Sequence, residues 1–217
     1  MTQAKNNSRT RVKVCGITRP SDAVFAVSLG VDAIGMIMYA DSPRKIDIEQ
    51  AKSIRSVVPA FVSLVGVYVN ATKEFINQTA QEIGLDVVQL HGSETNDFGQ
   101  SLNTEFVKAI RAKDPEQVNE SVNQFPDARA ILLDPYVKGQ AGGTGHQLEA
   151  QLWPKQANQA LVLAGGLSPT NLQNALSTFK PYAVDLNSGL ESSPGIKNAQ
   201  LLENAMRIIN NHSFSHE

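Results

Sequence analysis

The chain has 217 residues, 41% of them hydrophobic, with 19 basic and 21 acidic side chains and a formal net charge of −2. This length suits one large domain or two small ones, and the near-neutral charge carries no electrostatic signature for nucleic acid or an anionic membrane. We find no signal-peptide pattern and no apolar run of the roughly 20 residues that cross a bilayer. The single cysteine excludes an internal disulfide. We therefore expect a cytoplasmic monomer or homodimer that acts on a small molecule, with no nucleic-acid or membrane partner.

Apolar runs alternate with segments of helical spacing along the chain. In order, the predicted strand–helix pairs are Arg11 to Cys15 with Asp22 to Leu29, Val31 to Met38 with Asp47 to Val57, Phe61 to Val69 with Ala71 to Ile83, Asp86 to Leu90 with Asn96 to Leu102, Glu105 to Ile110 with Pro115 to Val122, Ala130 to Leu133 with His146 to Lys155, Leu161 to Leu163 with Pro169 to Ser177, and Tyr182 to Leu186 with Ala199 to Ile209. Ser21 with Asp22 is expected to cap the first helix, and Ser168 the one that starts at Pro169.

Strict alternation of strand and helix predicts parallel strands joined by right-handed crossovers. Continuous hydrophobicity, as in Val31 to Met38, is typical of strands buried on both faces. Eight such pairs favour a single-domain α/β fold, a (β/α)8 TIM barrel over residues 11–211, between a disordered tail at 1–10 and a C-terminal tail at 212–217. A doubly wound sheet is the alternative, but it needs a glycine-rich turn after the first strand, where Cys15-Gly16-Ile17-Thr18 stands instead.

The residues that follow each strand are the candidate chemical groups, because barrel enzymes keep their active sites at the carboxyl ends of the strands. Cys15 ends the first strand, and we expect Lys13, on the same side, to lower the pKa of its thiol. A small buried hydrophobe is the alternative role for such a cysteine. Asp134 ends the apolar strand Ile131-Leu132-Leu133, and poor solvation there suits a general acid. A helix cap or a salt bridge is the alternative for this carboxylate.

Glycines after the last two strands indicate a phosphate site built from backbone N–H groups. These positions are Gly165 and Gly166 after one strand, and Ser188 and Gly189 after the other. The glycine-rich stretch 139–145 is interpreted as a mobile lid.

Two further side chains extend the candidate site. Arg44, after Pro43, offers a planar fork to a carboxylate, unless it is an ordinary surface charge. His91 follows the fourth strand and is expected to face the same region; a structural role is the alternative for this lone histidine. His146, His212 and His216 show no metal-ligand spacing, so we expect no metal and no cofactor.

Together these motifs resemble the phosphoribosylanthranilate isomerase family. The resemblance covers roughly residues 11 to 210 and rests on Lys13-Val14-Cys15-Gly16-Ile17-Thr18, Ser42-Pro43-Arg44, Val65-Gly66-Val67-Tyr68-Val69-Asn70, Val88-Gln89-Leu90-His91-Gly92, Leu132-Leu133-Asp134, Gly142-Gly143-Thr144-Gly145, Leu163-Ala164-Gly165-Gly166-Leu167 and Val184-Asp185-Leu186-Asn187-Ser188-Gly189-Leu190-Glu191. Asn187 stands where many members have serine, a change that is tolerable if the backbone N–H is the donor.

The resemblance implies an Amadori rearrangement in tryptophan biosynthesis, which converts N-(5-phosphoribosyl)anthranilate into a 1-deoxyribulose 5-phosphate. It implies that Asp134 protonates the furanose oxygen and that Cys15 removes the proton from C2. It further implies that Arg44 holds the anthranilate carboxylate, that His91 lines the same site and that Asp185 lies near the sugar. Gly165, Gly166, Ser188 and Gly189 match the phosphate-binding positions.

Other functions remain open from the residues alone. Another phosphosugar barrel enzyme is one: a pentose-phosphate epimerase needs metal-binding histidines, and indole-glycerol-phosphate synthase needs an acid and lysine pair. A relative that acts on the ribonucleotide of histidine synthesis would have aspartate in place of Cys15. A non-catalytic phosphosugar-binding barrel or a thiol sensor is the alternative outside enzymology, and Asp134 argues against it.

Overall fold

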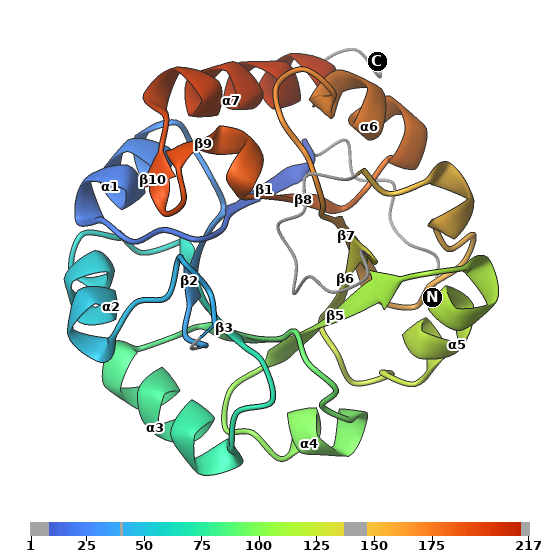
Figure 1. The fold of residues 1–217 in the computed structure, drawn as a ribbon, viewed down its shortest axis with the longest axis horizontal. Helices are drawn as coiled ribbons and strands as arrows, with labels where there is room; N and C mark the ends of the chain where they lie inside the picture. The colour runs from blue at the N-terminus through green and yellow to red at the C-terminus, as the bar shows by residue number, and fades with distance from the viewer. Residues whose placement is uncertain (1–8, 40, 137–146, 214–217) are drawn as a thin grey trace.

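The computed structural model describes residues 9–39, 41–136 and 147–213. Eight parallel strands, hydrogen-bonded in sequence order and closed between β8 and β1, form a barrel (Figure 1). The strands are β1 (Arg11–Val14), β2 (Ala33–Ile37), β3 (Ser63–Tyr68), β4 (Val87–Leu90), β5 (Phe106–Ala112), β6 (Ala130–Pro135), β7 (Ala160–Leu163) and β8 (Ala183–Leu186). The predicted barrel is therefore confirmed, and the doubly wound alternative is excluded.

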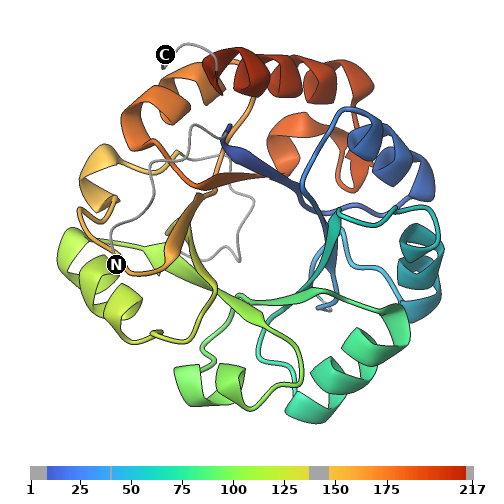
Figure 2. The same cartoon turned by 180° about the vertical axis from the view of Figure 1, so that it is seen from behind.

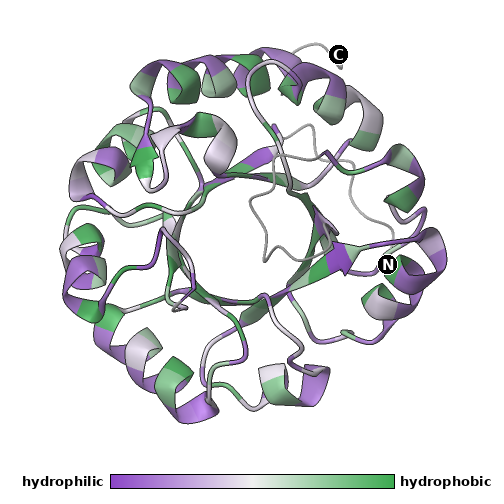
Figure 3. Cartoon of the chain, viewed as in Figure 1, coloured by the Kyte–Doolittle hydropathy of each residue, from purple (hydrophilic) through white to green (hydrophobic). Residues whose placement is uncertain are grey.

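Helices surround the barrel, as the view from behind also shows (Figure 2). They are α1 (Pro20–Ser28), α2 (Ile48–Arg55), α3 (Lys73–Ile83), α4 (Asn96–Gln100), α5 (Pro115–Asn123), α6 (Leu172–Phe179) and α7 (Ala199–Ser213). The helices carry both polar and apolar residues (Figure 3), and their apolar residues pack on the strands. None of these helices is both long and apolar enough to cross a membrane.

The two-residue period of the strands separates two sets of side chains. In β1, Val12 and Val14 join the large core between strands and helices, whereas Lys13 faces the inside of the barrel, as does Cys15 directly after the strand. Small apolar side chains fill the interior along β5 to β8, namely Ala109, Ala130, Leu132, Val162, Ala164 and Ala183. The barrel is thus packed beneath its carboxyl-terminal face, and the polar inward residues lie above that packing.

Two helices, α1 and α6, begin at other residues than predicted. Helix α1 begins at Pro20 after Arg19, and no side chain caps it, so the predicted cap at Ser21 and Asp22 is wrong. Asp22 instead pairs with Arg19 and accepts a hydrogen bond from the backbone of Lys197. Helix α6 begins only at Leu172, because residues 168–171 form a turn in which the Ser168 carbonyl accepts from the backbone N–H groups of Asn171 and Leu172.

The connections after β6 and β8 also differ from a regular helix. After β6, the predicted helix His146 to Lys155 is wrong over its described part, which forms only the short 3-10 helix η1 (Ala150–Leu152). After β8 comes a second 3-10 helix, η2 (Ser188–Leu190), and then a hairpin of β9 (Glu191–Ser193) and β10 (Ile196–Lys197) that the sequence did not predict. Figure 1 shows this hairpin beside α1, to which the Lys197–Asp22 hydrogen bond joins it.

A buried ion pair holds the loop after β4. The Lys108 ammonium donates to Glu94 at 2.9 Å and to the Gly92 carbonyl at 2.7 Å. Glu94 also accepts from the backbone N–H groups of Asn70 and Gly92. Burial acts to raise the pKa of Glu94, but Lys108 and the backbone N–H groups of Asn70 and Glu94 outweigh it and lower that pKa. Because Gly92 follows His91 directly, this network fixes the segment that carries His91.

The loop before β3 contains the most exposed apolar side chain of the described chain. Phe61 is 105% exposed, and its backbone has a φ of 71°. A left-handed conformation is costly for an aromatic residue, and Phe61 buries no apolar surface in return. Strand β3 accordingly starts at Ser63, two residues beyond the predicted start at Phe61.

We predict that Lys108→Met lowers the free energy of unfolding by about 3 kcal/mol, because the change leaves the Glu94 carboxylate buried without its cation. Urea unfolding followed by circular dichroism measures this loss. Lys52→Met is the matched control, since Lys52 pairs with Glu49 on the surface, and its unfolding midpoint should not move. Equal effects of the two substitutions would contradict the role given to the buried pair.

Candidate active site

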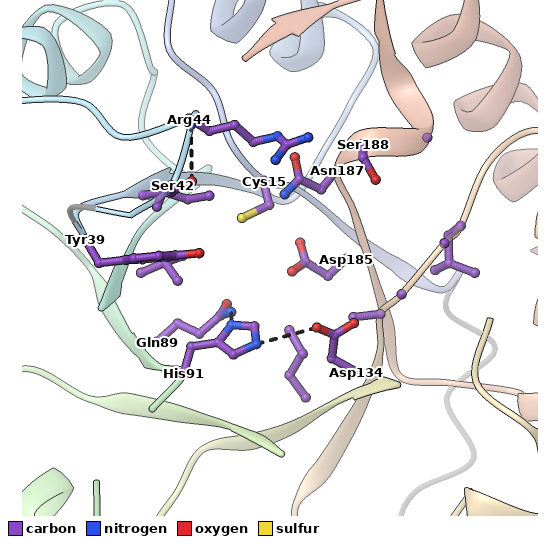
Figure 4. A pocket seen from close by; sticks show the side chains of 18 of the residues that line it. Cys15, Tyr39, Ser42, Arg44, Gln89, His91, Asp134, Asp185, Asn187 and Ser188 are labelled. Atoms are coloured by element: carbon purple, nitrogen blue, oxygen red, sulfur yellow. Dashed lines mark hydrogen bonds and ion pairs between the residues drawn. The ribbon is translucent and has the colours of Figure 1, made fainter. Parts of the chain in front are cut away.

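A cavity of about 280 Å³ opens at the carboxyl ends of the strands. It brings together all nine residues that the sequence singled out: Cys15, Arg44, His91, Asp134, Gly165, Gly166, Asp185, Ser188 and Gly189. Figure 4 shows the labelled side chains pointing into this space from the surrounding strand ends. Residues that lie up to 174 positions apart thus share one pocket because each follows, or ends, a strand of the same barrel.

Lys13 and Asp185 form a buried ion pair where β1 and β8 meet. They are register partners in this strand pair, and the Lys13 Nζ donates to both Asp185 carboxylate oxygens at 2.9 Å. Their side chains are only 10% and 8% exposed. Asp185 therefore lines the pocket with its charge already matched, as a holder of Lys13 rather than as a free carboxylate.

Cys15 lies beside this pair, and Gly35 of β2 makes room for it. A Cβ atom on Gly35 would lie 2.9 Å from both the Cys15 Sγ and the Lys13 Nζ. Only a glycine at this position leaves the thiol and the ammonium next to each other without a shift. The glycine is thus a packing requirement of the pocket, not of the strand.

The environment of Cys15 shifts its pKa in the direction opposite to our expectation. Burial raises the pKa of the thiol, Lys13 lowers it and Asp185 raises it again, and the net result is a raised pKa. The expectation that Lys13 would lower the thiol's pKa below its usual value is therefore wrong. Lys13 does act in that direction, but burial outweighs it, and the adjacent Asp185 carboxylate opposes it.

Asp134 ends β6 close to His91. The His91 Nε2 lies 3.6 Å from the Asp134 Oδ2 and has no hydrogen-bond partner among the described residues. The other ring nitrogen, Nδ1, lies 3.3 Å from the Gln89 side-chain amide. Gly165 adopts a φ of 89°, and a Cβ there would meet Pro135 and the Asp134 Oδ1. The carboxyl group is thus enclosed by β4 on one side and by the loop after β7 on the other.

Arg44 is held in place by the Glu191 carboxylate. Its Nε donates to both oxygens of Glu191, at 2.9 and 3.0 Å, and its Nη2 donates to Oε2 at 2.7 Å. Lys197 donates to the same carboxylate at 2.8 Å, and its side chain is 2% exposed. This cluster was not predicted, because it depends on the β9–β10 hairpin, which brings Lys197 opposite Glu191.

The loops after β7 and β8 meet through glycine. A Cβ on Gly189 would lie 2.0 Å from the Leu167 carbonyl oxygen, so only glycine lets these loops approach so closely. Within the described chain, the backbone N–H groups of Gly166, Ser188 and Gly189 donate to no protein group. Unbonded N–H groups that border a cavity form a site suited to an anion.

The predicted lid and the expected absence of a metal site can be compared only with the described residues. The glycine-rich stretch 139–145 lies outside them, as does His146. Among the described residues, no group of three or more His, Cys, Asp or Glu side chains has the arrangement of a metal site.

Sequence comparison identifies close relatives of the chain. The profile of the family described as N-(5'phosphoribosyl)anthranilate (PRA) isomerase matches residues 12–207. The chain is 41% identical over 206 residues to the N-(5'-phosphoribosyl)anthranilate isomerase of Pseudomonas fluorescens SBW25, covering 95% of this chain and 98% of that protein. It is 44% identical over 193 residues to the enzyme of the same name from Legionella pneumophila Lens, covering 88% and 93%.

Solved structures of phosphoribosyl anthranilate isomerases are also similar to the chain. The phosphoribosyl anthranilate isomerase of Thermotoga maritima superposes with a TM-score of 0.86 at 33% identity, over 93% of this chain and 99% of that chain. A second isomerase structure, in complex with reduced 1-(o-carboxyphenylamino)-1-deoxyribulose 5-phosphate, has a TM-score of 0.82 at 32% identity, with coverage of 93% and 99%.

We predict that alkylation of Cys15 by iodoacetamide has a pH midpoint above that of an ordinary thiol, because burial raises its pKa. Lys13→Met should move the midpoint higher, since it removes a cation. Asp185→Asn should move it lower, since it removes an anion and leaves Lys13 free to act on the thiolate. Mass spectrometry of the single cysteine gives each rate, and coincident midpoints would contradict this account.

Proposed function

The chain belongs to the N-(5'-phosphoribosyl)anthranilate isomerase family, and from this premise we propose that it converts N-(5'-phosphoribosyl)anthranilate into 1-(2-carboxyphenylamino)-1-deoxyribulose 5-phosphate. This is the Amadori rearrangement of tryptophan biosynthesis. One observation carries the proposal: a single cavity joins a thiol, a carboxyl group and a guanidinium to a pair of glycine loops. The reaction needs a base, an acid, a carboxylate site and a phosphate site, and these groups match that set.

The phosphate binds at the loops after β7 and β8. The unbonded N–H groups of Gly166, Ser188 and Gly189 are its donors, and the close approach of Gly189 to Leu167 brings the two loops together around it. Backbone donors hold an anion without adding a charged side chain near the reacting carbons. The bound phosphate sets the distance of the ribose ring from Asp134 on β6 and Cys15 at the end of β1.

Asp134 acts as the general acid that opens the ring. Its carboxyl proton passes to the furanose ring oxygen, the bond between that oxygen and C1 breaks, and the anilino nitrogen forms a C1=N⁺ iminium. Asp134 is buried at 7% exposure, and Gly165 lets the adjacent loop pack against its carboxyl group. This packing holds the acid in one orientation next to the space that the ring oxygen occupies.

Cys15 acts as the base in the second step. Its thiolate removes the proton from C2, and the C2–H electron pair forms the C1=C2 bond while the iminium nitrogen becomes neutral. The enolamine then tautomerises, with a proton added at C1 and one lost from the C2 hydroxyl. A raised thiol pKa makes the thiolate a stronger base once it forms.

Lys13 supports the thiolate from one side. Its ammonium is held beside Sγ by Asp185, so the positive charge stays in place throughout the turnover. The iminium adds a second positive charge, and does so only when the proton is to be removed. The charged form of the thiol is thus favoured most in the step that needs it.

We predict that Cys15→Ser and Asp134→Asn each lower kcat by at least about 10²-fold, because each removes a proton-transfer group. The assay follows the loss of anthranilate-ring fluorescence with freshly prepared phosphoribosylanthranilate. Both substitutions nearly preserve side-chain volume, so circular dichroism should show an unchanged fold. Turnover near that of the wild type in either variant would refute the acid–base assignment, and binding without conversion by the wild type would favour a binding protein.

We predict that Arg44→Ala raises KM for phosphoribosylanthranilate by about tenfold or more, with a smaller change in kcat. The physical reason is that the carboxylate contact exists equally in the ground state and the transition state. The same steady-state fluorescence assay measures both constants. An unchanged KM would show that the substrate carboxylate binds elsewhere.

A further inference from the structure

Arg44 has two edges that can each bind a carboxylate in a bidentate manner, and one of them is already occupied. Glu191 takes the Nε–Nη2 edge, with three contacts between 2.7 and 3.0 Å. Among the described residues, Nη1 has no hydrogen-bond partner. The Nη1–Nη2 edge is therefore left for a ligand in the cavity that Arg44 lines.

Glu191 is itself fixed by groups that do not face the ligand. Its Oε1 accepts from the Lys197 Nζ at 2.8 Å and from the Gly195 backbone at 3.2 Å. Lys197 in turn donates to the carbonyl and side-chain oxygens of Asn187, at 3.2 and 3.0 Å. The carboxylate is 4% exposed and the ammonium 2%, so water does not compete for these contacts.

The charges of this cluster favour an anionic ligand. Arg44 and Lys197 place two cations around the single carboxylate of Glu191. A lone Arg44–Glu191 pair would be neutral and would attract a second carboxylate poorly, but Lys197 restores an excess positive charge. Gly16 packs directly against both side chains, since a Cβ there would lie 2.8 Å from the Arg44 Cδ and 2.6 Å from the Asn187 Oδ1. The Glu191 contacts and this close packing thus hold the guanidinium in one arrangement.

We propose that Glu191, anchored by Lys197, is a positioning residue that holds the free edge of Arg44 toward the cavity and thereby makes the enzyme select substrates whose aromatic amine carries a carboxylate. This inference rests on the proposed function, because it takes the anthranilate carboxylate as the ligand of Arg44. It goes further in assigning selectivity to two residues that do not contact the substrate.

The test compares phosphoribosylanthranilate with phosphoribosylaniline, the same phosphosugar without the carboxylate. Glu191→Gln keeps the side-chain shape but replaces the carboxylate with an amide, so the Arg44 guanidinium loses its orientation. The ratio of kcat/KM for the two substrates should fall by about tenfold, through KM of the anthranilate compound and with kcat little changed. Product is followed by chromatography, since the aniline compound lacks the anthranilate ring. Glu191→Asp, which keeps the charge but shortens the arm, should give a smaller fall.

Glu105→Gln is the matched control. Glu105 holds Arg129 by a similar bidentate contact, at 2.6 Å for each oxygen, but on the surface and away from the cavity. It should leave the ratio unchanged. The ratio does not depend on the fraction of folded enzyme, because both substrates meet the same active molecules, so partial unfolding of a Glu191 variant does not obscure the result.

The outcomes separate the two proposals. If Arg44→Ala lowers the ratio and both Glu191 variants leave it unchanged, the positioning role is refuted and the proposed function stands. If Arg44→Ala also leaves the ratio unchanged, the carboxylate does not bind at Arg44, and the positioning role is refuted with it. If the wild type converts neither substrate, the proposed function itself is wrong.

Discussion

The ion pair between Lys13 and Asp185 lies at the seam where the barrel closes, and the pocket depends on it. The two residues are direct neighbours in the register of β1 and β8, so the strand pairing that closes the barrel also brings the two charges together. Buried ion pairs seldom add much stability, because desolvation offsets their attraction. Here the pair instead leaves a cation beside the only thiol of the chain and lines the pocket with a carboxylate that is paired with that cation.

The pocket contains two charged clusters, Lys13 with Asp185 and Arg44 with Glu191 and Lys197, and in each a carboxylate holds a cation. At Lys13, the Asp185 carboxylate keeps the cation next to Cys15. At Arg44, an anion behind the cation leaves one edge of the guanidinium for a ligand, and Lys197 supplies the charge that Glu191 cancels. In both places a buried carboxylate fixes a cation in one position. Such support removes the conformational entropy that a long side chain would otherwise lose when the ligand binds.

The sequence predicted the barrel and the polar strand ends because both follow from local rules. A two-residue period places Cys15 inside once Val14 is outside, and parallel strands bring their carboxyl ends to one face. Glu191 and Lys197 were missed as functional residues because their contact requires a tight hairpin, and no apolar period marks β9 or β10. The net direction of the Cys15 pKa was also missed, since burial is set by the whole fold whereas Lys13 is visible two residues away. The prediction of a helix after β6 was wrong: His146 to Lys155 has helical composition, but its described part forms only the short 3-10 helix η1.

Phe61 lies in the loop before β3, at the end of the barrel opposite the pocket. An aromatic ring that lies wholly in water, on a left-handed backbone, lowers stability without serving the pocket. Selection removes such a residue only when the fold approaches its stability threshold. At the carboxyl-terminal loops, by contrast, the glycines at 16, 165 and 189 lie so close to their neighbours that any added side chain would displace them. A substitution at Phe61 is thus expected to leave the pocket intact, whereas one at any of these three glycines changes its shape.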